Sequence, residues 1–206
     1  MQLMFWFDIS WSAHVINGAR RLKPSAPGYV HINSLEFIVV ILQLAAIVAR
    51  LEQFRSDPSK GLYFFPDGPP NIPVWLGEAD NTVSCSWETR ATAKTAQGQG
   101  LVSVYAELLR RCNVHTCCKH LAGKLNIVAD DISRNDFSLP FPARTAKLFR
   151  EHPMLASLDY FQPSAELLRL LTSRLFSKHV PVPCVLPTAL GQFVLAGCTT
   201  CTSVSL

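Results

Sequence analysis

The feature that most restricts the fold is an apolar run at residues 37–49 (FIVVILQLAAIVA), which holds no charged residue. A membrane span needs about 18 apolar residues or more, so this run is too short to predict one. Asn33 or Ser34 can cap a helix just before the run, and Glu36 would then lie in the first turn, where the helix dipole favours a carboxylate. A helix that is apolar on nearly every side is covered on more than one of them. We therefore predict a buried helix from about residue 34 to residue 54.

Strands and further helices alternate around this run. The predicted strands are aromatic or β-branched segments, and proline and glycine residues interrupt the chain between them. They lie at residues 2–9, 72–80 and 113–121, and helices are expected at residues 82–87, 101–112 and 125–133. This order predicts a mixed α/β domain over residues 1–135.

The chain changes character after residue 135. Residues 137–146 (FSLPFPARTA) contain two prolines and are expected to be extended. Residues 163–178 (PSAELLRLLTSRLFSK) predict an amphipathic helix that Ser164 caps. The remainder is rich in prolines and small residues and predicts a loosely ordered tail. We therefore treat residues 136–206 as an extension of the domain.

Composition indicates a folded chain and the compartment in which it works. Hydrophobic residues make up 49% and charged residues 17%, which excludes a disordered polyelectrolyte. The net charge of +4 permits a polyanionic partner without requiring one. The seven cysteines are irregularly spaced, and the adjacent Cys117 and Cys118 would point to opposite faces of a strand. No basic segment with a small-residue cleavage site opens the sequence. We expect reduced thiols and an intracellular protein, in the cytoplasm or nucleus.

Carboxylates stand in unusual settings at three places. Glu36 heads the apolar helix, Asp80 ends a predicted strand, and the adjacent Asp130 and Asp131 lie off the apolar face of a short helix. Each alone has an ordinary explanation. Glu36 would interact with the helix dipole, Asp80 would form part of a turn, and Asp130 and Asp131 would lie on a solvent-exposed helix face. Together they are of the type that holds two divalent cations, which clamp the attacking and leaving oxygens of phosphodiester hydrolysis. Carboxylate oxygens suit Mg²⁺ or Mn²⁺.

Three strings carry a family resemblance: HINSLEF, ADNT and KHLAGKLNIVADDISR. They resemble the ribonuclease H domain of retroelement reverse transcriptases, above all the tyrosine-recombinase (DIRS-type) elements. The third string is the most specific, because its histidine, glycine, asparagine, aspartate, serine and arginine all match at the family's spacing. The likeness covers about residues 5–135 and, more weakly, the PSAELLRLL segment that follows.

The resemblance implies a ribonuclease H-like fold, a mixed sheet flanked by helices, with four metal-binding carboxylates. Glu36, Asp80 and Asp130 match three of them, and the Ala-Asp order of the motif selects Asp130 over Asp131. His120 would lie near the cleaved phosphate, although a structural role for this histidine is as consistent with the sequence. The implied cofactor is Mg²⁺ or Mn²⁺, and the implied substrate is an RNA–DNA hybrid. A reverse transcriptase domain would precede this one in a parent polyprotein.

The fourth carboxylate is expected on the first strand, in a D-A-S segment followed by a glycine-rich turn. Asp8 begins D-I-S, but Ser-Trp-Ser-Ala follows in place of that turn. The segment FWFDISW more closely resembles the aromatic stretch after the turn. We therefore expect that the family's first aspartate lies upstream of Met1, that the first strands are incomplete and that hydrolysis is impaired. Asp8 enters the site only if the chain is not truncated.

Two other sets of residues suggest binding. Zinc is an alternative for the cluster Cys112, His115, Cys117, Cys118 and His120, but its spacing lacks paired C-x₂-C ligands. Basic residues that either contact a nucleic-acid backbone or form a solvated face are Arg110, Arg111, Lys119 and Lys124.

Three hypotheses follow. The first is a metal-dependent nuclease that cleaves the RNA of an RNA–DNA hybrid, recognised through its backbone and 2′-hydroxyls. The second is a catalytically dead fragment that retains the fold and binds nucleic acid. The third is a structural α/β interaction module whose carboxylates are incidental.

Overall fold

The long apolar helix predicted from the sequence is the centre of the molecule. In the computed structural model, which describes residues 5–24, 26–56, 74–79, 81–122, 126–134, 136–177 and 183–195, it is α2 (Ile32–Ser56). The helix begins earlier than expected, because the His31 side chain accepts a hydrogen bond from the Asn33 backbone N–H at 3.1 Å. Its window Ile32–Gln53 is long and apolar enough to cross a membrane, yet 72% of that window is buried inside the protein.

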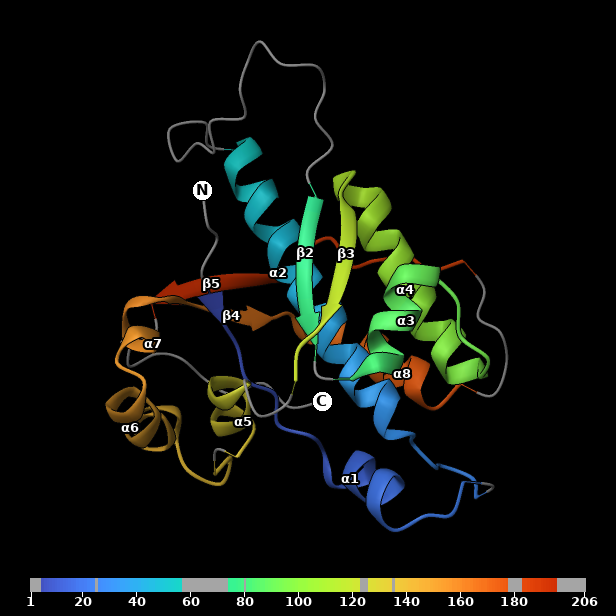
Figure 1. Cartoon of the computed structure of the whole chain (residues 1–206), viewed down its shortest axis with the longest axis horizontal. Helices are drawn as coiled ribbons and strands as arrows, with labels where there is room; N and C mark the ends of the chain where they lie inside the picture. Colours follow the sequence, from blue (N-terminus) through green and yellow to red (C-terminus); the bar gives the residue numbers. More distant parts are fainter. Residues whose placement is uncertain are drawn as a thin grey trace.

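The described strands form two separate sheets, so the mixed α/β class is confirmed. In the first sheet, β1 (Phe5–Trp6) runs parallel to β4 (Asp159–Pro163), which is antiparallel to β5 (Gly191–Leu195). In the second, β2 (Val74–Ala79) pairs in parallel with β3 (His115–His120). Figure 1 shows α2 between the first sheet and the helices α3 (Thr82–Arg90) and α4 (Ala96–Cys112).

Side-chain caps explain where the helices beside β2 and β3 begin. Asn81 caps α3, since its Oδ1 accepts from the backbone N–H groups of Val83 and Ser84 at 2.7 and 3.0 Å. Thr95 caps α4 through Gly98 N–H at 3.0 Å. The predicted start of α4 at residue 101 was wrong, because the glycines of the preceding AQGQG segment disguise its first turn.

The C-terminal extension differs from its prediction. The amphipathic helix is confirmed as α8 (Ala165–Leu175), with Ser164 accepting from Leu167 N–H at 3.2 Å. The expected extended segment is instead helix α6 (Phe141–Glu151), whose proline lies in the first turn, where no backbone donor is needed. The expectation of a loosely ordered tail is also wrong for residues 183–195, because they include β5, which pairs with β4.

Two hydrophobic clusters hold these parts together. The larger one contains α2, α4 and α8, and Leu190 before β5 belongs to it. The smaller one joins β1 and β4 to α6 and α7 (Met154–Ser157). In it, Trp6 stacks near Phe141 and its indole N–H donates to the Leu155 carbonyl at 3.1 Å. Each of the two clusters therefore contains residues from both sides of the predicted boundary at residue 135.

Candidate functional site

The HINSLEF and ADNT segments meet at the carboxyl end of β2. The Asn81 side-chain amide donates hydrogen bonds to the Glu36 carboxylate and to Asn33 Oδ1, the latter at 3.2 Å. Asn81 also caps α3, so one side chain connects the start of α2 to the start of α3. The contact joins positions 45 residues apart in sequence and fixes the Glu36 carboxylate beside the end of the strand.

Asp80 lies outside the described residues, so its part in the site stays a prediction. Its neighbours are described: Ala79 ends β2 and Asn81 caps α3. His120 ends β3 in register with Ala79, and the following N–H of Leu121 donates to the Ala79 carbonyl at 2.9 Å. The predicted auxiliary histidine therefore lies at the same end of the two-stranded sheet as Glu36.

The two adjacent aspartates of α5 (Ile127–Ser133) have different surroundings. Asp131 contacts His152 Nε2 at 2.8 Å, which ties α5 to the end of α6. Asp130 pairs with Arg134, one turn along its own helix, at 3.1 Å, and its side chain is 46% exposed. Of the two carboxylates, Asp130 is the one that a ligand from solution reaches more easily.

The described residues do not by themselves assemble a metal site. Among them, no three His, Cys, Asp or Glu side chains lie close enough to hold one ion. The set of Glu36, Asp80 and Asp130 stays a prediction. The zinc alternative gains no support from the geometry, because Cys112 donates to the carbonyl of Leu108 within α4 and Cys118 faces Cys85.

Asp8 is part of a buried ion pair. Its carboxylate accepts hydrogen bonds from Arg144 Nη2 at 2.8 and 3.0 Å, from Arg144 Nε at 3.1 Å and from the Tyr160 hydroxyl at 2.7 Å. The Asp8 and Arg144 side chains are 1% and 0% exposed. A carboxylate held in this way is available to a metal ion only if the ion pair with Arg144 is broken. Its surroundings favour the interpretation in which Asp8 is a structural residue.

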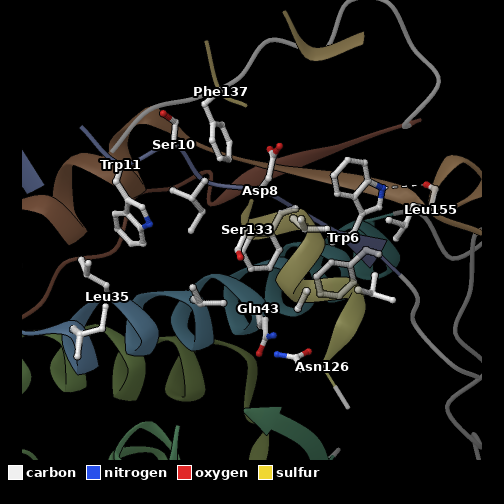
Figure 2. Close-up of a pocket in the computed structure, with 18 of the residues that line it drawn as sticks. Trp6, Asp8, Ser10, Trp11, Leu35, Gln43, Asn126, Ser133, Phe137 and Leu155 are labelled. Carbon is white, nitrogen blue, oxygen red and sulfur yellow. Dashed lines mark hydrogen bonds between the residues drawn. The ribbon is translucent and has the colours of Figure 1, made fainter. Parts of the chain in front are cut away.

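A cavity of about 930 Å³ lies between the extended segment that contains β1 and the helices α2 and α5. Trp75 of β2 also lines it, so it adjoins both sheets. Most of its lining is apolar or aromatic. Figure 2 shows Gln43 of α2 and Asn126, just before α5, directed toward each other at one side of this space. The apolar and aromatic lining suits an apolar group, and the polar side chains at its edge include Ser10 and Ser133.

The candidate basic residues divide into structural and exposed ones. Arg111 makes two hydrogen bonds to Glu52, at 2.7 and 3.0 Å, and also donates to the carbonyls of Pro187 and Thr188. Arg110 pairs with Glu107 on the surface of α4. Lys119 is exposed on β3, whereas Lys124 lies outside the described residues.

Sequence reasoning did not identify Asn81, Arg144 or Tyr160 as partners of the candidate carboxylates. Asn81 carried a usable signal, because it belongs to the ADNT string. Arg144 and Tyr160 carry none, since they meet Asp8 across 136 and 152 positions.

Comparisons with known proteins do not identify a family. No protein-family model, no curated protein and no solved structure matches this chain.

Proposed function

We propose that this chain is a ribonuclease H-like domain that hydrolyses the RNA strand of an RNA–DNA hybrid with Mg²⁺ or Mn²⁺. The proposal rests on the resemblance of three sequence strings to retroelement ribonuclease H domains. The observation that supports it most directly is the hydrogen bond between Asn81 and Glu36. It brings two of those strings together at a strand end, where α/β proteins commonly bind ligands.

The donor set fits a hard divalent cation. Glu36, Asp80 and Asp130 would supply carboxylate oxygens, which Mg²⁺ prefers. Bound cations at such a site lower the pKa of water and stabilise the charge of the leaving oxygen. The residues of the chain have the positioning role: Asn81 holds the Glu36 carboxylate beside the end of β2. Asp131 keeps α5 against His152, which leaves its neighbour Asp130 for the metal.

The pair between Asp130 and Arg134 does not prevent this role. Both side chains are substantially exposed, at 46% and 73%. Exposed ion pairs of this kind contribute about 0.3–0.5 kcal/mol. A divalent cation therefore displaces the Arg134 guanidinium at little cost.

A second candidate function is hybrid binding with little hydrolysis. The observation that favours it is the buried pair of Asp8 with Arg144, which withholds this carboxylate from a metal. Two cations repel each other, and a site with three carboxylates holds the second one weakly. We therefore expect slow cleavage together with salt-dependent binding.

The test is a cleavage assay on the purified chain with an end-labelled RNA–DNA hybrid. We expect slow cleavage of the RNA strand with Mg²⁺ or Mn²⁺ and none with a chelator. Glu36→Gln, Asp80→Asn and Asp130→Asn should each abolish it. The matched control Asp131→Asn should retain it, because an asparagine at this position can still form a hydrogen bond with His152. Hybrid binding without cleavage in the unmodified chain would favour the second function. Absence of both, in a chain that circular dichroism shows to be folded, would leave the structural interaction module.

A further inference from the structure

Two cysteine thiols face each other between α3 and β3. Cys118 of β3 donates a weak hydrogen bond to the sulfur of Cys85, and the two Sγ atoms are 2.9 Å apart. The residues are 33 positions apart, and both are half-buried free thiols. The neighbouring Cys117 is exposed on the other face of β3. The contact therefore results from the packing of α3 against β3, not from the proximity of these residues in sequence.

A buried carboxyl group lies against this pair. Glu88 is on α3, three residues after Cys85, so the two side chains share a face of the helix. The residue is 5% exposed. Burial raises the pKa of Glu88 above its ordinary value of 4.5, and hydrogen bonds with Cys118, Tyr105 and Thr116 lower it in part. Among the ion pairs of the described residues, none includes Glu88.

A dithiol with an adjacent carboxyl group has the parts that thiol–disulfide exchange requires. One thiolate attacks an external disulfide, a second thiol lies close enough to resolve the product, and a nearby group takes up its proton. We propose that Cys85 and Cys118 are a redox modification site, which a low-molecular-weight disulfide such as oxidised glutathione converts into a protein disulfide, with Glu88 as proton acceptor.

The exchange proceeds in two steps. The Cys85 thiolate attacks one sulfur of the external disulfide, forms a mixed disulfide and releases one small thiolate, which takes up the proton that Cys85 lost. The Cys118 thiol then gives its proton to the Glu88 carboxylate and attacks the Cys85 sulfur. The Cys85–Cys118 bond forms, and the second small thiolate leaves and takes the proton back from Glu88. Two protein thiols are oxidised, and one external disulfide is reduced to two thiols.

The pH dependence of the reaction has a clear direction. Burial raises the pKa of the Cys118 thiol above its ordinary value, and the hydrogen bond with Cys85 and the nearby Glu88 raise it further. Less thiolate is present at neutral pH as a result, so ring closure accelerates as the pH rises. Tyr105, whose pKa burial also raises, stays a neutral hydrogen-bond donor throughout.

The experiment measures the bond itself and does not depend on hybrid cleavage. The reduced full chain is incubated with oxidised glutathione at pH 7.0 and 8.5, quenched with iodoacetamide and analysed by intact and peptide mass spectrometry. We expect a loss of two hydrogens that dithiothreitol reverses, and faster formation at the higher pH. Tryptic peptide 112–119 contains three cysteines, so variants assign the bond.

The variants separate the proposal from its alternatives. Cys118→Ser should accumulate the glutathione adduct on Cys85, and Cys117→Ser, the matched neighbour, should still close the bond. Glu88→Gln removes the proton acceptor and should slow closure of the mixed disulfide at pH 7.0 by about 100-fold, the low end for a general base, because loss of its charge also lowers the pKa of Cys118. Independent alkylation of Cys85 and Cys118 with no cross-link, or a cross-link that survives Cys118→Ser, would overturn the site. An unchanged closure rate in Glu88→Gln would overturn the role of Glu88.

Discussion

The Arg144 guanidinium and the Asp8 carboxylate form an ion pair that is closed to solvent, with Nη2 and Oδ2 separated by 2.8 Å. The pair connects the segment after β1 to α6, across 136 positions. Tyr160 of β4 completes it with a hydrogen bond to the same carboxylate. The N-terminal segment is therefore held in place by residues of the C-terminal extension.

Replacing Arg144 by Met should destabilise the fold strongly. The substitution leaves the Asp8 carboxylate buried without its cation, and removal of one partner of a buried pair costs about 3–5 kcal/mol. The double variant Asp8→Asn/Arg144→Met should recover part of that loss, because no unpaired charge remains. Urea unfolding of the unmodified protein, the single variant and the double variant measures the loss of stability in each variant. Equal losses in the single and double variants would show that the charge of Asp8 is not the cause.

Asp8→Asn should leave hydrolysis per folded molecule nearly unchanged. Its carboxylate is paired with Arg144 and hydrogen-bonded to Tyr160, so we expect it to hold no metal ion. Asp80→Asn should abolish cleavage under the same conditions. The comparison uses initial rates, with the folded fraction determined by circular dichroism. Complete loss of metal-dependent cleavage in Asp8→Asn would place this residue in the metal site.

Asn81→Ser should separate capping from positioning. Serine is also a good helix cap, so the stability of α3 should change little, whereas Asn81→Ala should cost about 1 kcal/mol. Neither variant has the amide that donates to Glu36. Both should therefore need more Mg²⁺ for half-maximal cleavage. A thermal melt and a metal titration of each variant provide the test, and an unchanged metal requirement in Asn81→Ser would remove the positioning role.

Leu42→Ala should lower the free energy of unfolding by about 2–5 kcal/mol. Leu42 is fully buried on α2 within the larger cluster, and truncation leaves a cavity there. Val39→Ala is the matched control, because Val39 is half-buried and already lines the cavity between the sheets. Its loss should be smaller. Denaturant unfolding measures the free energy of unfolding of both variants. Equal losses in the two would contradict the burial of Leu42.

Glu88→Gln should stabilise the protein at neutral pH. Burial raises the pKa of Glu88 in the folded state above 4.5, so the folded protein binds this proton more tightly than the unfolded chain does. The stabilising contribution of the protonated group is complete below pH 4.5 and is lost as the pH rises through the folded-state pKa. Gln stays neutral, so the gain in stability of Glu88→Gln over the unmodified protein should be largest at pH 7 and absent near pH 4. Melting temperatures across this range test the sign.

The elements that the sequence predicted well are those with local signals. The apolar run from Phe37 specifies α2, and Ser164 with its leucine-rich face specifies α8. The start of α4 was missed because glycines occupy its first turn, and α6 was missed because proline discourages helix prediction. The pairing of β1 with β4 was not predictable, since it joins residues more than 150 positions apart.

In the candidate site, too, local signals were predictable and contacts between distant residues were not. Motif residues identified Glu36, and its contact with Asn81 follows from the way β2 leads into α3. The Ala-Asp order of the motif selects Asp130 over Asp131, whereas the contact of Asp131 with His152 is one that no spacing in the sequence reveals. Likewise, the partner of Cys118 depends on how α3 lies against β3. Periodicity indicates which faces are buried, but not which side chains meet there.

The position of α2 has a consequence for the dynamics of the whole chain. It contacts α3 and α4 on one side and β4 and β5 on the other, so neither side keeps its core if this helix melts. Amide hydrogens in its middle, around Leu42 and Ala46, should therefore exchange with solvent only when the entire molecule opens. Their exchange rates would report the global free energy of unfolding, and the two sheets should lose protection in a single cooperative event.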